Sequence, residues 1–232
     1  MSPESRRPSA AAKGGSLVVV QVGSEHVEYA VHKALLMEQS EYFERALGGP
    51  WKEAEEGMVR LDDVDCGIFE IFVDWLYTNT LPEDQSAWDD SGHERGSAKG
   101  TERTMIKVCA LAHRLLATNF GRAVTYEVVR CFINENGEAP PYYDTIIFAF
   151  EILPPTSPIL QLLVDLHCLR YCSEHDSQDK SEFQLRSRLP HEFLVRTMLR
   201  YSKLIKGSPI RVLEACDYHE HGSAQEREEC QG

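Results

Sequence analysis

The segment that follows Asp65 contains the pattern that most restricts the fold of this chain. Asp65 stands at the position of an N-cap, and large apolar side chains then occupy most faces of a helix. A helix with so little polar surface belongs in a core, because neighbouring elements must cover it on several sides. We expect the domain to be built around its apolar residues, which are Ile68, Phe69, Phe72, Trp75 and Leu76.

Two short segments near the start of the chain predict a β-hairpin. Residues 17–22 are a largely β-branched run that ends at Gly23-Ser24, and residues 27–31 then alternate between apolar and polar side chains. Because residues 17–22 are apolar at nearly every position, both faces and an exposed edge of this strand need cover.

Between the hairpin and the apolar helix, the spacing of apolar residues becomes helical from His32 onward. Ser40 is a good N-cap for a further helix that carries Phe43 and Leu47 on one face. Residues 58–61 then form a short predicted strand. The predicted order is strand, strand, helix, helix, strand, helix, which indicates an α+β domain.

The remaining segments differ in composition. Residues 82–103 are rich in Gly, Ser, Pro and charged side chains, which predicts a flexible insertion in which Trp88 stands alone. Apolar residues with helical spacing predict an all-helical C-terminal region over 131–213. We expect a disordered tail at residues 1–15 and an acidic disordered tail at residues 214–232.

Charge and cysteine usage limit the partners and the compartment. The formal net charge of −13 repels phosphate backbones and anionic lipid heads, so neither nucleic acid nor a membrane is an expected partner. No apolar stretch is long enough to span a membrane, and no secretory signal is present. The seven cysteines are scattered without a Cys-x-x-Cys pair, which favours free thiols in the cytoplasm or the nucleus.

Three blocks of the sequence resemble the BTB/POZ domain in content, order and spacing. They are VHKALLMEQSEYF at 31–43, VRLDDVD at 59–65 and FEIFVDWLYT at 69–78. The resemblance covers roughly residues 16–130. Together with residues 51–54 and the helical tail, the chain looks most like fungal proteins that carry one amino-terminal BTB domain.

The resemblance implies a small sheet flanked by a helical cluster, acting without catalysis as a docking and self-association module. In this family a second copy of the chain often covers the exposed strand. Many members have Asp at the position of Leu17, and in the transcriptional-repressor type this Asp and the basic residue matching Lys33 line a charged pocket at the dimer interface. Lys33 therefore lacks that partner here, and we interpret it as a solvated residue at a helix start.

His32 matches the histidine of the family's His-Lys pair. We interpret it as a histidine that is hydrogen-bonded inside the fold, where strand and helix meet, and not as a ligand or a catalytic group. The predicted structural core accordingly consists of His32, Phe43, Phe69, Phe72 and Leu76.

Trp51-Lys52-Glu53 falls where cullin-binding BTB adaptors resemble one another in a hydrophobic-x-Glu motif, just before the third strand. An indole supplies a large anchor, and Glu53 can fix orientation through a charge-assisted hydrogen bond. Trp51 and Glu53 are therefore the predicted partner-binding residues, and a cullin scaffold of a ubiquitin ligase is a candidate partner. The alternative is that Trp51 packs over the turn at 48–50 while Glu53 is solvated.

One cluster resembles a metal site. On a continuous helix, Cys168, Cys172 and His175 share one face and could supply three zinc ligands, with His167 beside them. The same spacing describes a core stripe, which we favour, because buried cysteine behaves as a small hydrophobe. The alternative function is a metal-binding hydrolase or sensor. We expect residues 219–221, His-Glu-His, to lack a scaffold that could hold a ligand geometry.

No motif for nucleophilic or phosphate chemistry is present. The sequence contains no Gly-x-Ser-x-Gly elbow, no phosphate-binding glycine loop ending in Lys-Ser/Thr, and no dinucleotide fingerprint after a strand. We therefore expect a protein that is not an enzyme and needs no cofactor.

Overall fold

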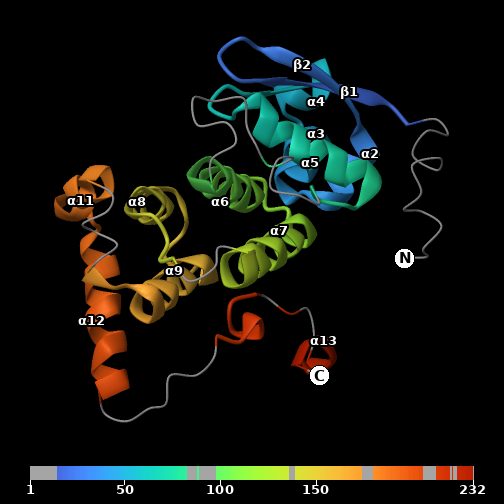
Figure 1. The fold of residues 1–232 in the computed structure, drawn as a ribbon. Coiled ribbons are helices and arrows are strands. Elements are labelled where there is room, and N and C mark those ends of the chain that lie inside the picture. Colours follow the sequence, from blue (N-terminus) through green and yellow to red (C-terminus); the bar gives the residue numbers. More distant parts are fainter. Residues whose placement is uncertain are drawn as a thin grey trace. The chain divides into compact units, whose positions relative to one another are not determined.

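The computed structural model of this chain describes residues 15–82, 88, 98–135, 139–173, 180–205, 213–219, 221 and 224–231 (Figure 1). These residues divide into two compact units. The first unit comprises residues 1–95 and 107–121, and the second comprises residues 96–106 and 122–232.

The first unit contains a three-stranded mixed sheet with β1 (Leu17–Val22) in the centre. β2 (Val27–His32) pairs with β1 in antiparallel orientation, which confirms the predicted hairpin, and β3 (Met58–Leu61) pairs with its other edge in parallel. The expectation that β1 has an exposed edge is wrong, because both edges are hydrogen-bonded to strands of its own chain.

The helices of this unit follow the predicted order, with one addition. α2 (Lys33–Gln39) and α3 (Glu41–Gly48) follow the hairpin, and α5 (Cys66–Thr78) follows β3. α4 (Lys52–Glu56) lies between α3 and β3 and ends where Gly57 adopts a φ of +64°. A helix of little more than one turn is too short to show a periodic pattern, so the sequence does not reveal it.

Aromatic rings fill the core of the first unit around α5. Phe43 stacks on Phe72 with 6.5 Å between ring centroids, and Phe72 meets Phe120 edge-on at 5.0 Å. Phe120 comes from α7 (Thr118–Arg130), and Phe69 is buried beside Phe72. The predicted α+β fold is confirmed, with α5 as its central helix.

The two predicted helix caps behave differently. The Ser40 hydroxyl accepts a hydrogen bond from the Phe43 backbone N–H at 3.2 Å and donates to the Leu115 carbonyl at 2.5 Å, which confirms it as the N-cap of α3. Asp65 occupies the N-cap position of α5 without a side-chain cap hydrogen bond. Its carboxylate instead accepts from Lys107 Nζ at 2.6 Å.

The flexible insertion predicted at 82–103 is wrong in two of its parts. α6 (Ala98–Arg114) begins inside it, and Trp88 is only 1% exposed, with its indole N–H donating to the Pro82 carbonyl at 3.1 Å. Composition hides the start of α6 because a group that buries it, Thr145 beside Glu102, is distant in the sequence. Residues 83–87 and 89–97 lie outside the described residues, as do residues 1–14 of the predicted tail.

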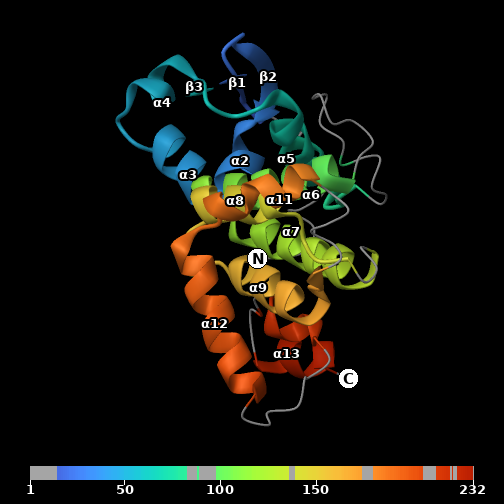
Figure 2. The same ribbon diagram turned by 60° about the vertical axis from the view of Figure 1, so that its left-hand side comes forward.

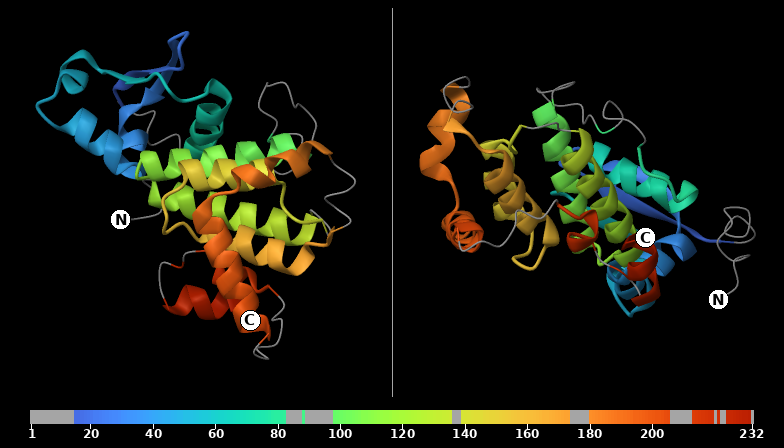
Figure 3. Two further views of the ribbon diagram at one scale, coloured as in Figure 1. Left: turned by 90° about the vertical axis from the view of Figure 1, so that its left-hand side faces the viewer. Right: turned by 60° about the horizontal axis from the view of Figure 1, so that its bottom comes forward.

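Helices build the second unit, which confirms the predicted helical C-terminal region. They include α8 (Tyr143–Ile152), α9 (Pro158–Arg170), α11 (Lys180–Leu185) and α12 (His191–Ile205). α9 packs against both α8 and α12 (Figures 2 and 3). Its apolar side chains are buried on most faces, namely Ile159, Leu160, Leu162, Leu163, Val164 and Leu166.

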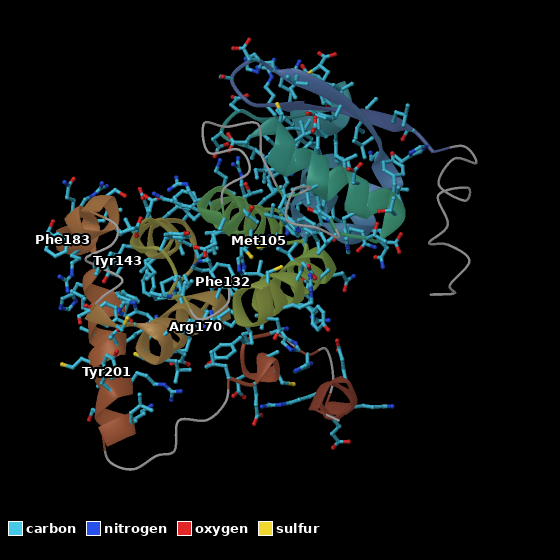
Figure 4. All side chains as sticks on the ribbon, in the orientation of Figure 1. Met105, Phe132, Tyr143, Arg170, Phe183 and Tyr201 are labelled. Carbon is cyan, nitrogen blue, oxygen red and sulfur yellow. The ribbon has the colours of Figure 1, made fainter. Side chains whose placement is uncertain are left out.

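A π-helix at Cys131–Glu135 continues α7 and is held by the end of α9. The Arg170 guanidinium donates to the carbonyls of Phe132 and Ile133 at 2.9 and 2.8 Å (Figure 4). Carbonyl groups near a helix end have lost their usual partners, so this arginine satisfies acceptors that would otherwise be costly to bury.

The disordered tail predicted at 214–232 is wrong for the residues that the structure describes there. A 3-10 helix at Ala215–Asp217 is followed later by α13 (Ala224–Gln231), and both Cys216 and Tyr218 are buried. The Tyr218 hydroxyl donates to Asp165 of α9 at 2.7 Å. Because this anchor is remote in the sequence, the local acidic composition gives no sign of it.

Candidate functional site

Trp51 lies between the end of α3 and the first turn of α4, where it is the N-cap residue of α4. It is 60% exposed, and it is the bulkiest of the large apolar side chains that the described residues leave exposed. Exposed tryptophan on an ordered backbone is a costly arrangement in water, and tryptophan is enriched among the residues that dominate binding energy.

The indole of Trp51 also rests on the preceding turn. A Cβ atom added at Gly49 would lie 2.5 Å from the indole Cδ1 and 2.6 Å from Nε1. One edge of the ring therefore packs against Gly49 while most of the residue stays in solvent. The two interpretations of Trp51, anchor for a partner and cover for a turn, are compatible in this geometry.

α4 carries three carboxylates close to Trp51 in the sequence. Glu53 and Glu55 are in the first turn, and Glu56 forms an exposed ion pair with Lys52 at 3.3 Å. The exposed carboxylate of Glu53 lies two residues from the indole along the chain. We call Trp51 and Glu53 the α4 surface. Its chemistry fits a partner that offers an apolar pocket beside basic side chains.

His32 lies at the end of β2, where α2 begins. Its Nδ1 lies 2.7 Å from the Tyr77 hydroxyl of α5, and the His32 backbone N–H donates to the same hydroxyl oxygen at 3.2 Å. The side chain is half-buried and joins the sheet to α5. The neighbouring Lys33 is also half-buried, and Leu17, opposite His32 in the register, is 56% exposed.

Phe43, Phe69 and Phe72 are fully buried, and Leu76 is buried beside them on α5. The first unit therefore contains the three-stranded sheet, the aromatic core and the α4 surface. A comparison with protein-family models matches residues 13–129 to the BTB/POZ domain. This chain belongs to the BTB/POZ family.

BTB domains are typically non-catalytic modules that bind other proteins. The α4 surface, His32 and the aromatic core all lie inside the matched range of this BTB protein. The half-buried position of His32 against Tyr77 gives it a structural contact that joins two elements.

The metal site considered at 168–175 lacks the helix on which it depends. α9 ends at Arg170, so Cys172 lies beyond the helix and is exposed, and His175 falls outside the described residues. Cys168 is buried, and burial raises the pKa of its thiol to about 11. The arrangement of Cys168 and Cys172 on one continuous helical face is therefore wrong, and the hydrolase or sensor alternative loses this part of its geometry.

A different cluster, at Cys216, His219 and His221, was missed by the sequence reasoning. The Cys216 Sγ lies 3.0 Å from His221 Nε2, and the two histidine rings lie 4.7 Å apart. The expectation that this segment lacks a scaffold is wrong, because Tyr218 is anchored on buried Asp165. The spacing Cys-x-x-His-x-His was the available signal.

A buried acid lies elsewhere in the second unit. Glu102 of α6 accepts a hydrogen bond from the Thr145 hydroxyl at 2.6 Å. Burial raises the pKa of Glu102 to about 7, although the hydrogen bonds from Thr145 and from the Tyr142 backbone oppose this shift. Asp144 beside it pairs with Arg103 at 2.6 Å. This polar cluster connects α6 with α8 and is a determinant of stability.

None of the helices in the described part of the chain combines the length and the apolar character that crossing a bilayer requires.

Proposed function

We propose that this BTB protein is a non-catalytic adaptor that binds a protein partner through the α4 surface. The observation that carries the proposal is the exposure of Trp51 at an ordered helix start, with Glu53 in the first turn of the same helix. An aromatic anchor beside a carboxylate can combine apolar burial with a directional hydrogen bond.

The contact between Trp51 and Gly49 supports the same proposal energetically. Because the ring already rests against the turn, few of its rotamers remain to be lost when a partner binds. An indole held in this way is pre-organised for a pocket. A freely rotating surface side chain would lose more conformational entropy on binding.

The candidate partner is a cullin-type scaffold, which would make this protein a substrate adaptor of a ubiquitin ligase. Two features support this choice. Trp51-Lys52-Glu53 resembles the hydrophobic-x-Glu motif of cullin-binding BTB adaptors, and α4 lies immediately before β3, where that motif occurs.

Calorimetric titration of the full chain with a purified cullin-type scaffold tests the proposal. We expect Trp51→Ala to raise the Kd at least tenfold, which corresponds to about 1.4 kcal/mol, because the anchor is lost. Adding Glu53→Lys to Trp51→Ala should weaken binding further, since it reverses the charge beside the anchor.

Phe183→Ala is the matched control, since Phe183 is an exposed aromatic residue of similar exposure, 52%, on α11. It should bind the scaffold as the unaltered chain does. Equal affinity of the Trp51→Ala and unaltered chains would contradict a role of the α4 surface. Tight binding that Trp51→Ala leaves intact would place the interface elsewhere.

Self-association is a second candidate function, favoured by one observation. Leu17 is an apolar residue at the start of β1 that stays 56% exposed, in a family whose members often pair through this end of the domain. A second copy would remove this side chain from water. Because β1 lies between β2 and β3, a contact between two copies at Leu17 would cover the end of β1 and not one of its edges.

We infer that the protein works in the cytoplasm or the nucleus. Six of the seven cysteines are free thiols in the structure, namely Cys66, Cys109, Cys131, Cys168, Cys172 and Cys216, which fits a reducing compartment. Fluorescence microscopy of the tagged full chain would test this inference, and a signal confined to the secretory pathway would contradict it.

A further inference from the structure

Three metal-binding side chains converge in the C-terminal segment of the second unit. The Sγ atom of Cys216 and one ring nitrogen each of His219 and His221 all lie within 4.8 Å of one another. Among the residues that the structure describes, no other group of three histidines, cysteines or carboxylates brings its donor atoms into such a cluster. Cys216 is buried, and both histidines are half-buried.

The backbone around these side chains is held in place by a buried polar network. Tyr218, between Cys216 and His219, donates its hydroxyl hydrogen bond to Asp165 at 2.7 Å. Asp165 is itself buried and pairs with Arg200 Nε at 2.9 Å. The segment is therefore fixed to α9 and α12, which gives the cluster the scaffold that a ligand geometry requires.

Further contacts restrict the ligands themselves. His219 packs edge-on against Tyr126 of α7 at 5.5 Å between ring centroids. Cys216 Sγ lies 3.9 Å from the Arg227 carbonyl of α13, and the His221 ring meets His219 at 4.7 Å. Contacts from α7 and α13 thus limit how far the three donors can turn away from one another.

We propose that Cys216, His219 and His221 bind one Zn²⁺ ion. Thiolate and imidazole are the ligands that zinc prefers, and a tetrahedral ion holds them at about 2.3 Å and 2.0–2.1 Å. Donor atoms around such an ion lie about 3.3–3.6 Å apart. On binding, the 3.0 Å distance between Cys216 Sγ and His221 Nε2 would widen slightly. The largest distance between two donor atoms, which is at most 4.8 Å, would shorten by about 1 Å through side-chain rotation.

Binding replaces the Cys216–His221 contact by bonds from both atoms to the metal. The thiol proton leaves to solvent as the sulfur–zinc bond forms, and the neutral histidines each donate a ring nitrogen lone pair. The fourth position is filled by water or by a carboxylate, and Glu226 is close enough to His219 to interact electrostatically with it. The ion would join the side chains of Cys216, His219 and His221 without adding catalysis.

Zinc titration of the full chain tests the proposal after removal of metal by a chelator and dialysis. We expect one equivalent of Zn²⁺ to bind. Cobalt(II) used as a probe should give a thiolate charge-transfer band and the visible bands of a tetrahedral site. Cys216→Ser should abolish the charge-transfer band, and His221→Gln should raise the Kd for zinc at least tenfold.

The matched controls are Cys172→Ser and His191→Gln, which alter an exposed cysteine and an exposed histidine outside the cluster. Both should bind zinc as the unaltered chain does. Because Cys216 is buried, circular dichroism checks the fold of Cys216→Ser, and the half-buried His221 provides a variant that does not disturb the core. Absence of stoichiometric binding overturns the proposal, as does binding that Cys172→Ser removes and His221→Gln does not.

Discussion

Phe72 links the three helices that form the core of the BTB domain, since its ring contacts both Phe43 and Phe120 and lies beside Phe69. We expect Phe72→Ala to lower the free energy of unfolding by about 3–5 kcal/mol, because it leaves a cavity at a fully buried site. Such a loss is a large part of the total stability of a typical domain. Urea denaturation followed by circular dichroism measures it.

Val27→Ala is the control for this measurement, since Val27 is an exposed apolar residue of the same domain. Its effect should stay below about 1 kcal/mol. An unchanged denaturation midpoint in Phe72→Ala would show that α5 is peripheral to the cooperative core.

Glu102 should make stability depend on pH. Its pKa is about 7 in the folded chain against an ordinary value of 4.5, so the folded state binds the proton more tightly than the unfolded state. The free energy of unfolding should therefore fall as pH rises from about 4.5 to 7, by an amount on the order of 3 kcal/mol at most.

Glu102→Gln should remove this dependence, because a neutral amide can still accept the Thr145 hydrogen bond and has no charge to bury. We expect the variant to exceed the unaltered chain in stability at pH 8 and to match it near pH 4. Thermal unfolding across this pH range measures both curves. Parallel curves would show that another group controls the pH dependence.

At the scale of elements, local patterns predicted what local contacts decide. Ser40 caps α3 through its own third neighbour, and the apolar surface of α5 could belong only to a core. The central position of β1 depends on its parallel pairing with β3, which lies much later in the chain. No pattern within residues 17–22 contains that information.

The candidate sites show the same division. Trp51 was predicted because its residue type and its neighbours carry the motif. His219 and His221 are expected from the sequence to lack a scaffold, because their anchor Asp165 lies some fifty residues earlier. The helical face assigned to Cys168 and Cys172 fails because α9 ends at Arg170, a boundary that the apolar spacing does not mark.

The start of α6 is an element whose order can be tested by proteolysis. Lys99 pairs with Asp144 and Glu182, and Arg103 pairs with Asp144 and stacks on Phe148 at 4.1 Å. Cleavage after these residues requires local unfolding of the helix. Limited trypsin digestion should therefore spare them and cut earlier after Lys203, which is exposed in the last turn of α12.

Mass spectrometry of the early fragments identifies the cuts. Early cleavage after Arg103 would show that residues 98–103 are flexible, as composition alone suggests. Protection after Arg103 together with cleavage after Lys203 would confirm that α6 begins at its observed position.

At the scale of the whole molecule, the formal net charge of −13 opposes contact between two copies of this chain. The exposed Leu17 favours such a contact, because its burial removes apolar surface from water. Salt reduces the repulsion within a screening distance of about 10 Å at 0.1 M and leaves the apolar contribution in place. Self-association, where it occurs, should therefore tighten with ionic strength.

Sedimentation equilibrium of the full chain at micromolar concentrations, in low and moderate salt, measures this balance. We expect the average mass to rise with concentration from one chain toward two, and to rise further in moderate salt. Leu17→Lys should restore the mass of one chain, because it places a charge where the apolar contact forms. Leu194→Lys on α12 alters another exposed leucine and should leave the mass unchanged. A mass of one chain at every concentration and salt level would rule out the self-association proposal. A different protein would then be the candidate to cover the exposed Leu17.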